Sequence, residues 1–239
     1  MQEIYRKIPC GCITRKDKIG FLPRLKARVS AEYFMMTVQE QYMVGRVLRA
    51  STRGFACGTQ SNRVNSNQDF GAFVSAPIAN DDSIQAVGLI YAVEIKDDLL
   101  VNELVMADSV NSSILRDQRE NRMVPMEISV LNIGYRYNNG AVVHSLPPRP
   151  PMSLSQVDLC TRDVILDFTR RHDYLTLILN AAEVPSDDLL AAAVRYASWQ
   201  YEDEQQRYQF LVGCGRAIAR QLSHDLKRLE HVLALIRPA

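Results

Sequence analysis

The sequence predicts an α+β fold in which a small N-terminal β-barrel is followed by a C-terminal helical domain. Short apolar runs with internal glycines crowd residues 42–96, and a proline-rich stretch occupies residues 146–151. Beyond the prolines, apolar residues recur at helical spacing instead of strand spacing. Hydrophobic residues make up 47% of the 239 positions and charged residues 23%, which is ordinary for a globular protein and supplies enough apolar material for a core.

We expect four consecutive parts in the chain. These are a basic tail (1–41), a barrel with an inserted segment (42–146), a proline connector (147–151) and a helical domain (152–239). The tail holds eight Lys and Arg against four Asp and Glu. It fits a flexible tail, or an arm that neutralises phosphates of a nucleic acid. A third interpretation is a mis-assigned start, because Met35 and Met36 stand just before the first apolar run.

Five strands are expected in the barrel part. They cover residues 42–50, 54–57, 71–77, 84–95 and 123–133. Gly45 and Gly88 lie inside apolar runs, and glycine lets a strand bend or bulge where a small sheet curves strongly. The run 84–95 is apolar on both faces, with Leu89 on one and Ile90 on the other. Such a strand is buried on both sides, or forms a barrel wall that another element covers.

A hairpin and a connector are expected after these strands. Asn138-Asn139-Gly140 separates two strand-like runs, and Asn-Gly favours a type I′ turn because both central residues need positive φ. Residues 146–151 contain four prolines. Proline cannot continue a helix or a strand ladder, so we expect an extended polyproline connector between the β part and the α part.

Helices are expected from Thr161 onward. Thr161 is the predicted N-cap of the first helix, which ends near Pro185, and Ser186 is the predicted N-cap of the next. One long last helix is predicted over residues 205–236, about 45–50 Å in length. A continuous apolar stripe on this helix is typical of a bundle core or a contact between copies. The predicted oligomer seam consists of Leu222, Leu226, Leu229 and Leu233.

We find no convincing catalytic motif in the sequence. No phosphate-binding loop of the nucleotide-hydrolase type is present. His224 and His231 are seven residues apart, but two ligands do not make a metal site. Glu94, Asp97 and Asp98 give a weak hydrolase hypothesis, since metal-dependent nucleases gather carboxylates at strand ends. We therefore expect a non-enzymatic protein with no cofactor and no metal.

Cysteine usage and hydropathy bear on the compartment. The five cysteines are scattered and odd in number, which does not indicate a disulfide framework. They are typical of reduced, structural cysteines in a cytoplasmic protein. No run approaches the ~20 apolar residues of a membrane helix.

Three glycine-containing motifs follow one another in the barrel part: Val44-Gly45-Arg46-Val47, Gly71-Ala72-Phe73-Val74 and Val87-Gly88-Leu89-Ile90-Tyr91. In this order they resemble the HAS-barrel that HerA-type translocases share with the α and β subunits of ATP synthase. The later stretches Asn132-Ile133-Gly134-Tyr135, 146–151 and 187–193 are similar to stand-alone HAS-barrel proteins that carry a C-terminal helical part. This resemblance covers about residues 42–236.

The resemblance implies an assembly role. In HerA-type proteins the barrel helps an ATPase ring form and offers the surface that docks the nuclease NurA in DNA-end processing. The expected partner is thus a HerA-like ATPase or a NurA-like nuclease, with DNA contacted indirectly. The alternative is an independent nucleic-acid-binding barrel. Either role gives the same candidate contact residues, which are Arg46, Arg49, Arg53 and Arg63.

Overall fold

The computed structural model describes residues 42–60, 68–95 and 125–237, which lie within the compact unit Tyr42–Ala239. The predicted basic tail (1–41) and the alternative start at Met35 or Met36 lie outside the described residues. The strands are β1 (Met43–Ala50), β2 (Gly54–Gln60), β3 (Phe73–Ile78), β4 (Asp81–Ile95), β5 (Pro125–Tyr137), β6 (Val142–Val143) and β7 (Gln156–Leu159). The helices are α4 (Arg162–Thr169), α5 (Tyr174–Leu179), α6 (Ser186–Ser198), α7 (Glu204–Gln221) and α8 (Leu226–Ile236).

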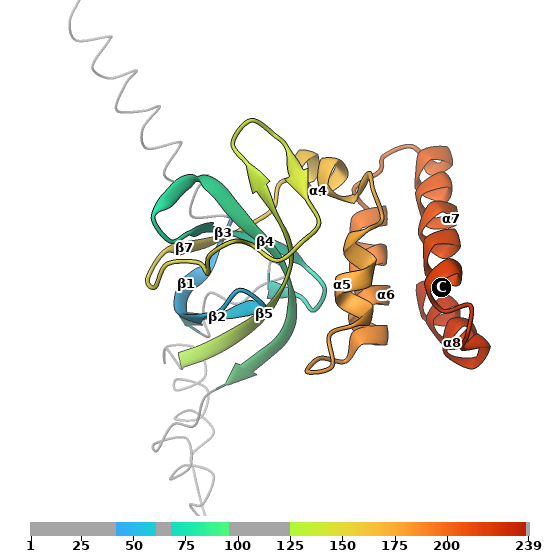
Figure 1. Cartoon of the computed structure of the whole chain (residues 1–239), viewed down its shortest axis with the longest axis horizontal. Helices are drawn as coiled ribbons and strands as arrows, with labels where there is room; N and C mark the ends of the chain where they lie inside the picture. Colours follow the sequence, from blue (N-terminus) through green and yellow to red (C-terminus); the bar gives the residue numbers. More distant parts are fainter. Residues whose placement is uncertain (1–41, 61–67, 96–124, 238–239) are drawn as a thin grey trace, which may run out of the picture. The chain divides into compact units, whose positions relative to one another are not determined.

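The strands form a closed antiparallel barrel. Their order is β2-β1-β7-β3-β4-β5-β6, and β2 also pairs with β5 along its whole length. That second pairing closes six strands, while β6 extends from β5 as a hairpin arm (Figure 1). The predicted combination of a small barrel with helices is therefore confirmed. All five strands expected between residues 42 and 133 are present, with somewhat different ends.

The inside of the barrel is a core of its own. Small and β-branched side chains fill it, as a narrow six-stranded barrel requires. The buried residues that form this interior include Val44, Val47, Phe55, Cys57, Val74, Ile90, Ile128, Val130 and Val157. A bulge between Val47 and Arg49 bends β1 around them.

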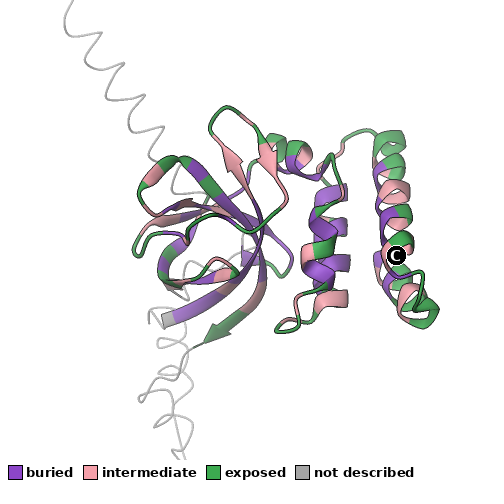
Figure 2. Cartoon of the chain, in the orientation of Figure 1, coloured by how far each residue is buried: buried purple, intermediate pink, exposed green. Residues whose placement is uncertain are grey.

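A second, larger core lies between the barrel wall and the helices. Phe73, Leu89 and Ile133 point outward from β3, β4 and β5 into a cluster that contains Phe168 and Tyr174. In Figure 1, α5 and α6 lie next to the barrel, and α7 and α8 lie on the far side of α6. Figure 2 shows the resulting purple band of buried residues through the barrel wall and α6. The two-faced strand 84–95 is thus a barrel wall that helices cover, as predicted.

The proline stretch does not mark the end of the β part. It runs beside β3, where the N–H of Ala79 donates to the carbonyl of Pro150 at 2.9 Å and Ile78 bridges to Pro151. The chain then forms β7, which fills the gap between β1 and β3. The expected start of the helical domain at residue 152 is therefore wrong, because β7 follows it and the first helix, α4, begins at Arg162. With only four residues, β7 is too short to show a strand period in the sequence. Its conformation is set by pairing with the two strands that flank it.

The helices are shorter than the sequence pattern predicts. The expected helix 205–236 is two helices, α7 and α8, separated at residues 222–225. The Asp225 carboxylate accepts the backbone N–H of Arg228 at 3.0 Å and caps α8. The helix expected between Thr161 and Pro185 is likewise divided into α4 and α5. In both places apolar residues keep helical spacing across the break, so the sequence pattern does not reveal where one helix ends and the next begins.

The predicted hairpin is present, but its turn is of another type. β5 and β6 pair around Asn138-Asn139-Gly140, and the N–H of Gly140 donates to the carbonyl of Tyr137 at 2.9 Å. Gly140 has φ +89, whereas Asn139 does not have positive φ. A type I′ turn needs positive φ at both central residues. The turn is therefore a type I turn followed by a glycine in the left-handed region.

Candidate functional site

Three of the four predicted contact arginines lie on the outside of the barrel near β1. Arg46 and Arg49 project from the outer side of β1, and Arg53 lies in the turn between β1 and β2. Arg63 falls outside the described residues. Each of the three described arginines donates a hydrogen bond to an oxygen atom of the protein itself. A ligand would therefore have to compete with these oxygen atoms.

Arg49 forms a two-pronged ion pair with Glu127 of β5. Its Nη1 donates to Oε2 at 3.0 Å, and its Nη2 donates to Oε1. Glu127 is 6% exposed, whereas the Arg49 side chain is 67% exposed. A buried carboxylate is costly without a cation, which explains why Arg49 reaches across the small residues of β2. The hydrogen bond and charge of Glu127 raise the pKa of Arg49.

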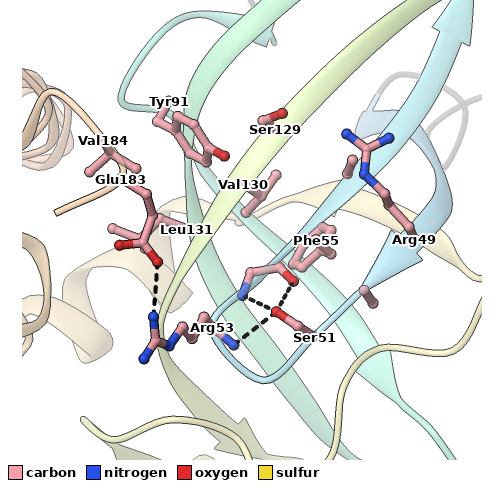
Figure 3. A pocket seen from close by; sticks show the side chains of 13 residues that line it. Arg49, Ser51, Arg53, Phe55, Tyr91, Ser129, Val130, Leu131, Glu183 and Val184 are labelled. Atoms are coloured by element: carbon pink, nitrogen blue, oxygen red, sulfur yellow. Dashed lines mark hydrogen bonds and ion pairs between the residues drawn. The ribbon is translucent and has the colours of Figure 1, made fainter. Parts of the chain in front are cut away.

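Arg53 connects the barrel to the helices. Its Nη1 donates to Oε1 of Glu183, in the connection between α5 and α6, at 3.3 Å (Figure 3). Ser51 shapes the turn that carries Arg53, because its Oγ donates to the carbonyl of Gly54 at 3.1 Å. Both partners of the Arg53–Glu183 pair are more than half exposed, and such surface pairs contribute little to stability. This pair can open without much cost.

A pocket of about 290 Å³ lies between these two ion pairs. Arg49, Arg53, Tyr91, Ser129 and Glu183 line it together with apolar barrel residues (Figure 3). A second pocket of about 400 Å³ shares Arg53 and Glu183 with it and continues toward Leu146. Its described charged side chains are Arg49, Arg53 and Glu183. All three are engaged in the ion pairs on either side of the pocket.

Arg46 belongs to a different surface. Its Nη1 donates to the carbonyl of Leu154 at 3.2 Å. The backbone N–H of Leu154 in turn donates to the carbonyl of Val47 at 2.8 Å, next to Leu48. Leu48, Met152 and Leu154 are 52%, 51% and 71% exposed, and we name these three residues the β1–β7 patch. Leu154 also has φ +65, a left-handed conformation that a leucine rarely adopts.

The described arginines do not form a cationic strip that awaits phosphates. Arg49 and Arg53 face carboxylates, and Arg46 bonds a backbone carbonyl. A nucleic-acid backbone would have to compete with Glu127 for Arg49 and with Glu183 for Arg53. Within the described part of the chain, these three arginines therefore each donate to an acceptor of the protein itself.

The four leucines of the predicted seam do not lie on one surface. Leu222 is 4% exposed and belongs to the core between barrel and helices, and Leu229 packs against that core. Leu226 and Leu233 are 70% and 36% exposed. The break between α7 and α8 separates Leu222 from the other three and turns it inward.

The candidate metal and carboxylate residues do not converge. Glu94 is exposed near the end of β4, while Asp97 and Asp98 lie outside the described residues. His224 and His231 are both exposed. Among residues 42–60, 68–95 and 125–237, no group of three potential ligands is placed to hold a metal ion.

One cysteine and one histidine do lie close together. Sγ of Cys214 is 3.9 Å from Nδ1 of His172, between α7 and the loop before α5. Burial raises the pKa of Cys214 to about 12 and lowers that of His172. Because the thiolate is the nucleophile, a thiol that stays protonated in the core is a packing residue. Burial likewise raises the pKa of Cys57 and of Cys160 to about 12, and all three are free thiols.

The acidic partners of the arginines, Glu127 and Glu183, were not among the site residues predicted from the sequence. Glu127 stands alone in an apolar strand, and an isolated carboxylate in such a run is a signal that a cation must meet it. Glu183 gave no such signal, because a carboxylate in a polar connection is ordinary. Its role follows from the placement of the α5–α6 connection beside the β1–β2 turn.

In the described part of the chain, no helix has both the length and the apolar character needed to cross a membrane. The whole sequence matches no protein-family model and no curated protein.

Proposed function

We propose that this chain is a non-enzymatic assembly module that docks a separate ATPase or nuclease of the HerA or NurA kind in DNA-end processing. The sequence resemblance to HAS-barrel proteins names the partner class. The observation that carries the proposal is the β1–β7 patch on the closed barrel. It leaves Leu48, Met152 and Leu154 exposed beside Arg46.

The β1–β7 patch has the composition of a docking surface. Exposed apolar side chains with an arginine beside them are typical of the centre of a protein–protein contact. A leucine in the left-handed region costs about 1 kcal/mol or more. Leu154 is 71% exposed, so packing within the described residues does not offset that cost. The backbone of Leu154 is held by its hydrogen bonds to Val47 and Arg46, and a partner that covers its side chain would account for the exposure.

Affinity capture at native expression level tests the proposal. We expect the tagged full-length chain to recover a HerA-like ATPase or a NurA-like nuclease, in a ring-sized particle by mass photometry. Leu154→Glu should abolish that recovery, because it places a charge in the contact. The matched control is Leu226→Glu, which changes an equally exposed leucine (70% against 71%) on α8 and should leave recovery intact.

Two outcomes would contradict the proposal. Capture of the chain without either enzyme would remove the assembly role. Equal recovery with Leu154→Glu and wild type would show that the partner does not use the β1–β7 patch. Steeply salt-dependent binding of DNA by the isolated chain would instead support the nucleic-acid hypothesis.

A further inference from the structure

The pocket of about 400 Å³ between the barrel and the α5–α6 connection plays no part in the proposed docking. Its volume lies in the range of roughly 300–1,000 Å³ that is typical of small-molecule sites. Its charged lining residues are Arg53 and Glu183. The apolar residues that line it are Leu131, Leu146, Leu177, Ala181 and Ala182. Because Asn132 is the buried polar residue of this lining, we name it the Asn132 pocket.

Asn132 presents a hydrogen-bond acceptor that no described residue uses. The residue is 1% exposed. Its backbone N–H donates to the carbonyl of Arg53 at 2.8 Å, and its Nδ2 donates to the carbonyl of Thr52 at 3.0 Å. Its Oδ1 is enclosed and accepts no hydrogen bond from the described part of the chain. A buried acceptor without a donor destabilises the folded state, so a ligand that brings an N–H group to Oδ1 would remove that cost.

Arg53 and Glu183 form a pair that a ligand can separate. Nη1 of Arg53 lies 3.3 Å from Oε1 of Glu183 (Figure 3), and the two side chains are 75% and 51% exposed. An ion pair in water contributes little stability, so opening it has a low cost. Each partner then needs an opposite charge from the ligand. A zwitterion supplies a carboxylate for Arg53 and an ammonium group for Glu183 in one molecule.

We propose that the Asn132 pocket binds a free aliphatic α-amino acid. Its carboxylate accepts hydrogen bonds from the Arg53 guanidinium. Its ammonium group has three N–H donors, of which one reaches Glu183 and another reaches Oδ1 of Asn132 as the Arg53–Glu183 pair opens. Its side chain packs against the leucines of the lining, where Leu146 is 41% exposed and offers an apolar surface.

Other ligand classes match this lining less well. A wholly apolar ligand would leave Oδ1 of Asn132 without a donor. A nucleotide or polyphosphate would meet one lining arginine and the repulsion of Glu183. An amino acid with a charged side chain would bury that charge among leucines and alanines. The inference does not depend on the proposed ATPase or nuclease partner, because the pocket shares no residue with the β1–β7 patch.

Isothermal titration calorimetry on the purified full-length chain tests the inference. The probes are L-leucine, L-isoleucine, L-valine and L-methionine, each titrated separately. We expect saturable binding of at least one of them, with one site per chain and a rise in Tm when it is added. The forms of that amino acid without its ammonium group or without its carboxylate, such as isocaproate and leucinamide for leucine, should each bind about tenfold or more weakly.

Substitution of the two charged residues locates the site. Arg53→Ala and Glu183→Gln should each weaken binding about tenfold or more, since each removes one charged partner. Leu146→Glu should also weaken it, because it places an anion at the apolar wall. The matched control is Arg162→Ala, which breaks an exposed arginine–glutamate pair outside the pocket and should bind like wild type. Asn132 is left intact because its Nδ2 also holds the β1–β2 turn.

Three outcomes would overturn the inference. One is the absence of saturable binding for all four amino acids at millimolar concentrations. Another is unchanged affinity in either Arg53→Ala or Glu183→Gln, and the third is a deaminated ligand that binds as tightly as the amino acid. The Tm of each variant without ligand identifies any that is misfolded, and the remaining variant then decides. Since no partner protein is present, failure here is separate from failure of affinity capture.

Discussion

His144 illustrates how a single residue is fixed by the tertiary structure. Its side chain is 2% exposed and packs against Phe168 with ring centres 4.7 Å apart and the rings tilted by 59°. Its Nε2 lies 2.9 Å from the backbone carbonyl of Phe168, so Nε2–H is the donor. Nδ1 faces Asp173 at 3.8 Å, and that carboxylate is shared with Arg171. Burial lowers the pKa of His144 from 6.5, although the Phe168 carbonyl and Asp173 favour the charged form.

This environment predicts a loss of stability on mild acidification. The folded state binds fewer protons than the unfolded state at His144, so its contribution to stability is complete above pH 6.5 and decreases as the pH falls below that value. The pKa of His172 is lowered in the same direction. We expect the free energy of unfolding in urea to decrease from about pH 7 to about pH 5.

Substitution of His144 tests the assignment. His144→Gln keeps an N–H donor but does not titrate, so its free energy of unfolding should decrease less over the same pH interval. His172 should preserve part of the dependence. The matched control is His231→Gln on the exposed side of α8, which should follow the wild-type curve. An unchanged slope in His144→Gln would show that His144 is not a source of the pH dependence.

At the scale of secondary-structure elements, α6 approaches the barrel closely at Gly71. Gly71 precedes β3 and has φ +85. Its N–H donates to the carbonyl of Ile90 at 2.8 Å. A Cβ atom at Gly71 would lie 2.6 Å from Cβ of Ala192 and 2.9 Å from the backbone carbon of the same residue. The backbone of α6 can therefore come this close to residue 71 only because that residue has no side chain.

Gly71→Ala should destabilise the protein by about 3 kcal/mol, combining the left-handed penalty of 1–2 kcal/mol with a steric clash against a helix backbone. Gly140→Ala is the matched control. It has a similar φ of +89, but the nearest atom to a Cβ there is 4.0 Å away, so about 1 kcal/mol is expected. Urea denaturation measures both. Equal losses would contradict a close contact between α6 and the barrel.

For the whole described unit, the main feature is that barrel and helices share one core. Phe73, on the outer side of β3, makes edge-on ring contacts with Phe168 and Tyr174 at 6.4 Å. Leu89 and Ile133 enter the same cluster from β4 and β5. Three strands of the barrel therefore have an apolar outer surface that is buried because the helices cover it.

A chain truncated after Cys160 should accordingly fail to form a stable barrel. It would expose Phe73, Val87, Leu89 and Ile133, an apolar area that a small barrel cannot leave in water without aggregation. We expect aggregation or a loss of cooperative urea unfolding. The full-length chain, in contrast, should show coincident transitions for barrel and helices by hydrogen exchange. A soluble, cooperatively folded truncated chain would contradict the shared core.

Local patterns in the sequence determined much of this protein. Alternation and internal glycines located five strands, and the Asn-Gly pair located the hairpin. The two apolar faces of residues 84–95 predicted a strand buried on both sides or a covered barrel wall, and the second alternative is the one observed. These features depend mainly on residues that are near one another in the chain, so a local sequence pattern is enough to predict them. The HAS-barrel resemblance adds a hypothesis about function that the structure leaves as a proposal.

Other features were decided by contacts between distant segments. β7 exists because β1 and β3 leave a gap that four residues fill. The last helix divides at Asp225, and the division turns Leu222 inward while Leu226 and Leu233 stay exposed. Arg49 and Arg53 acquire their carboxylate partners from residues 78 and 130 positions away. No local pattern records which segments will meet, because the free energy that decides it comes from burying and pairing groups in three dimensions.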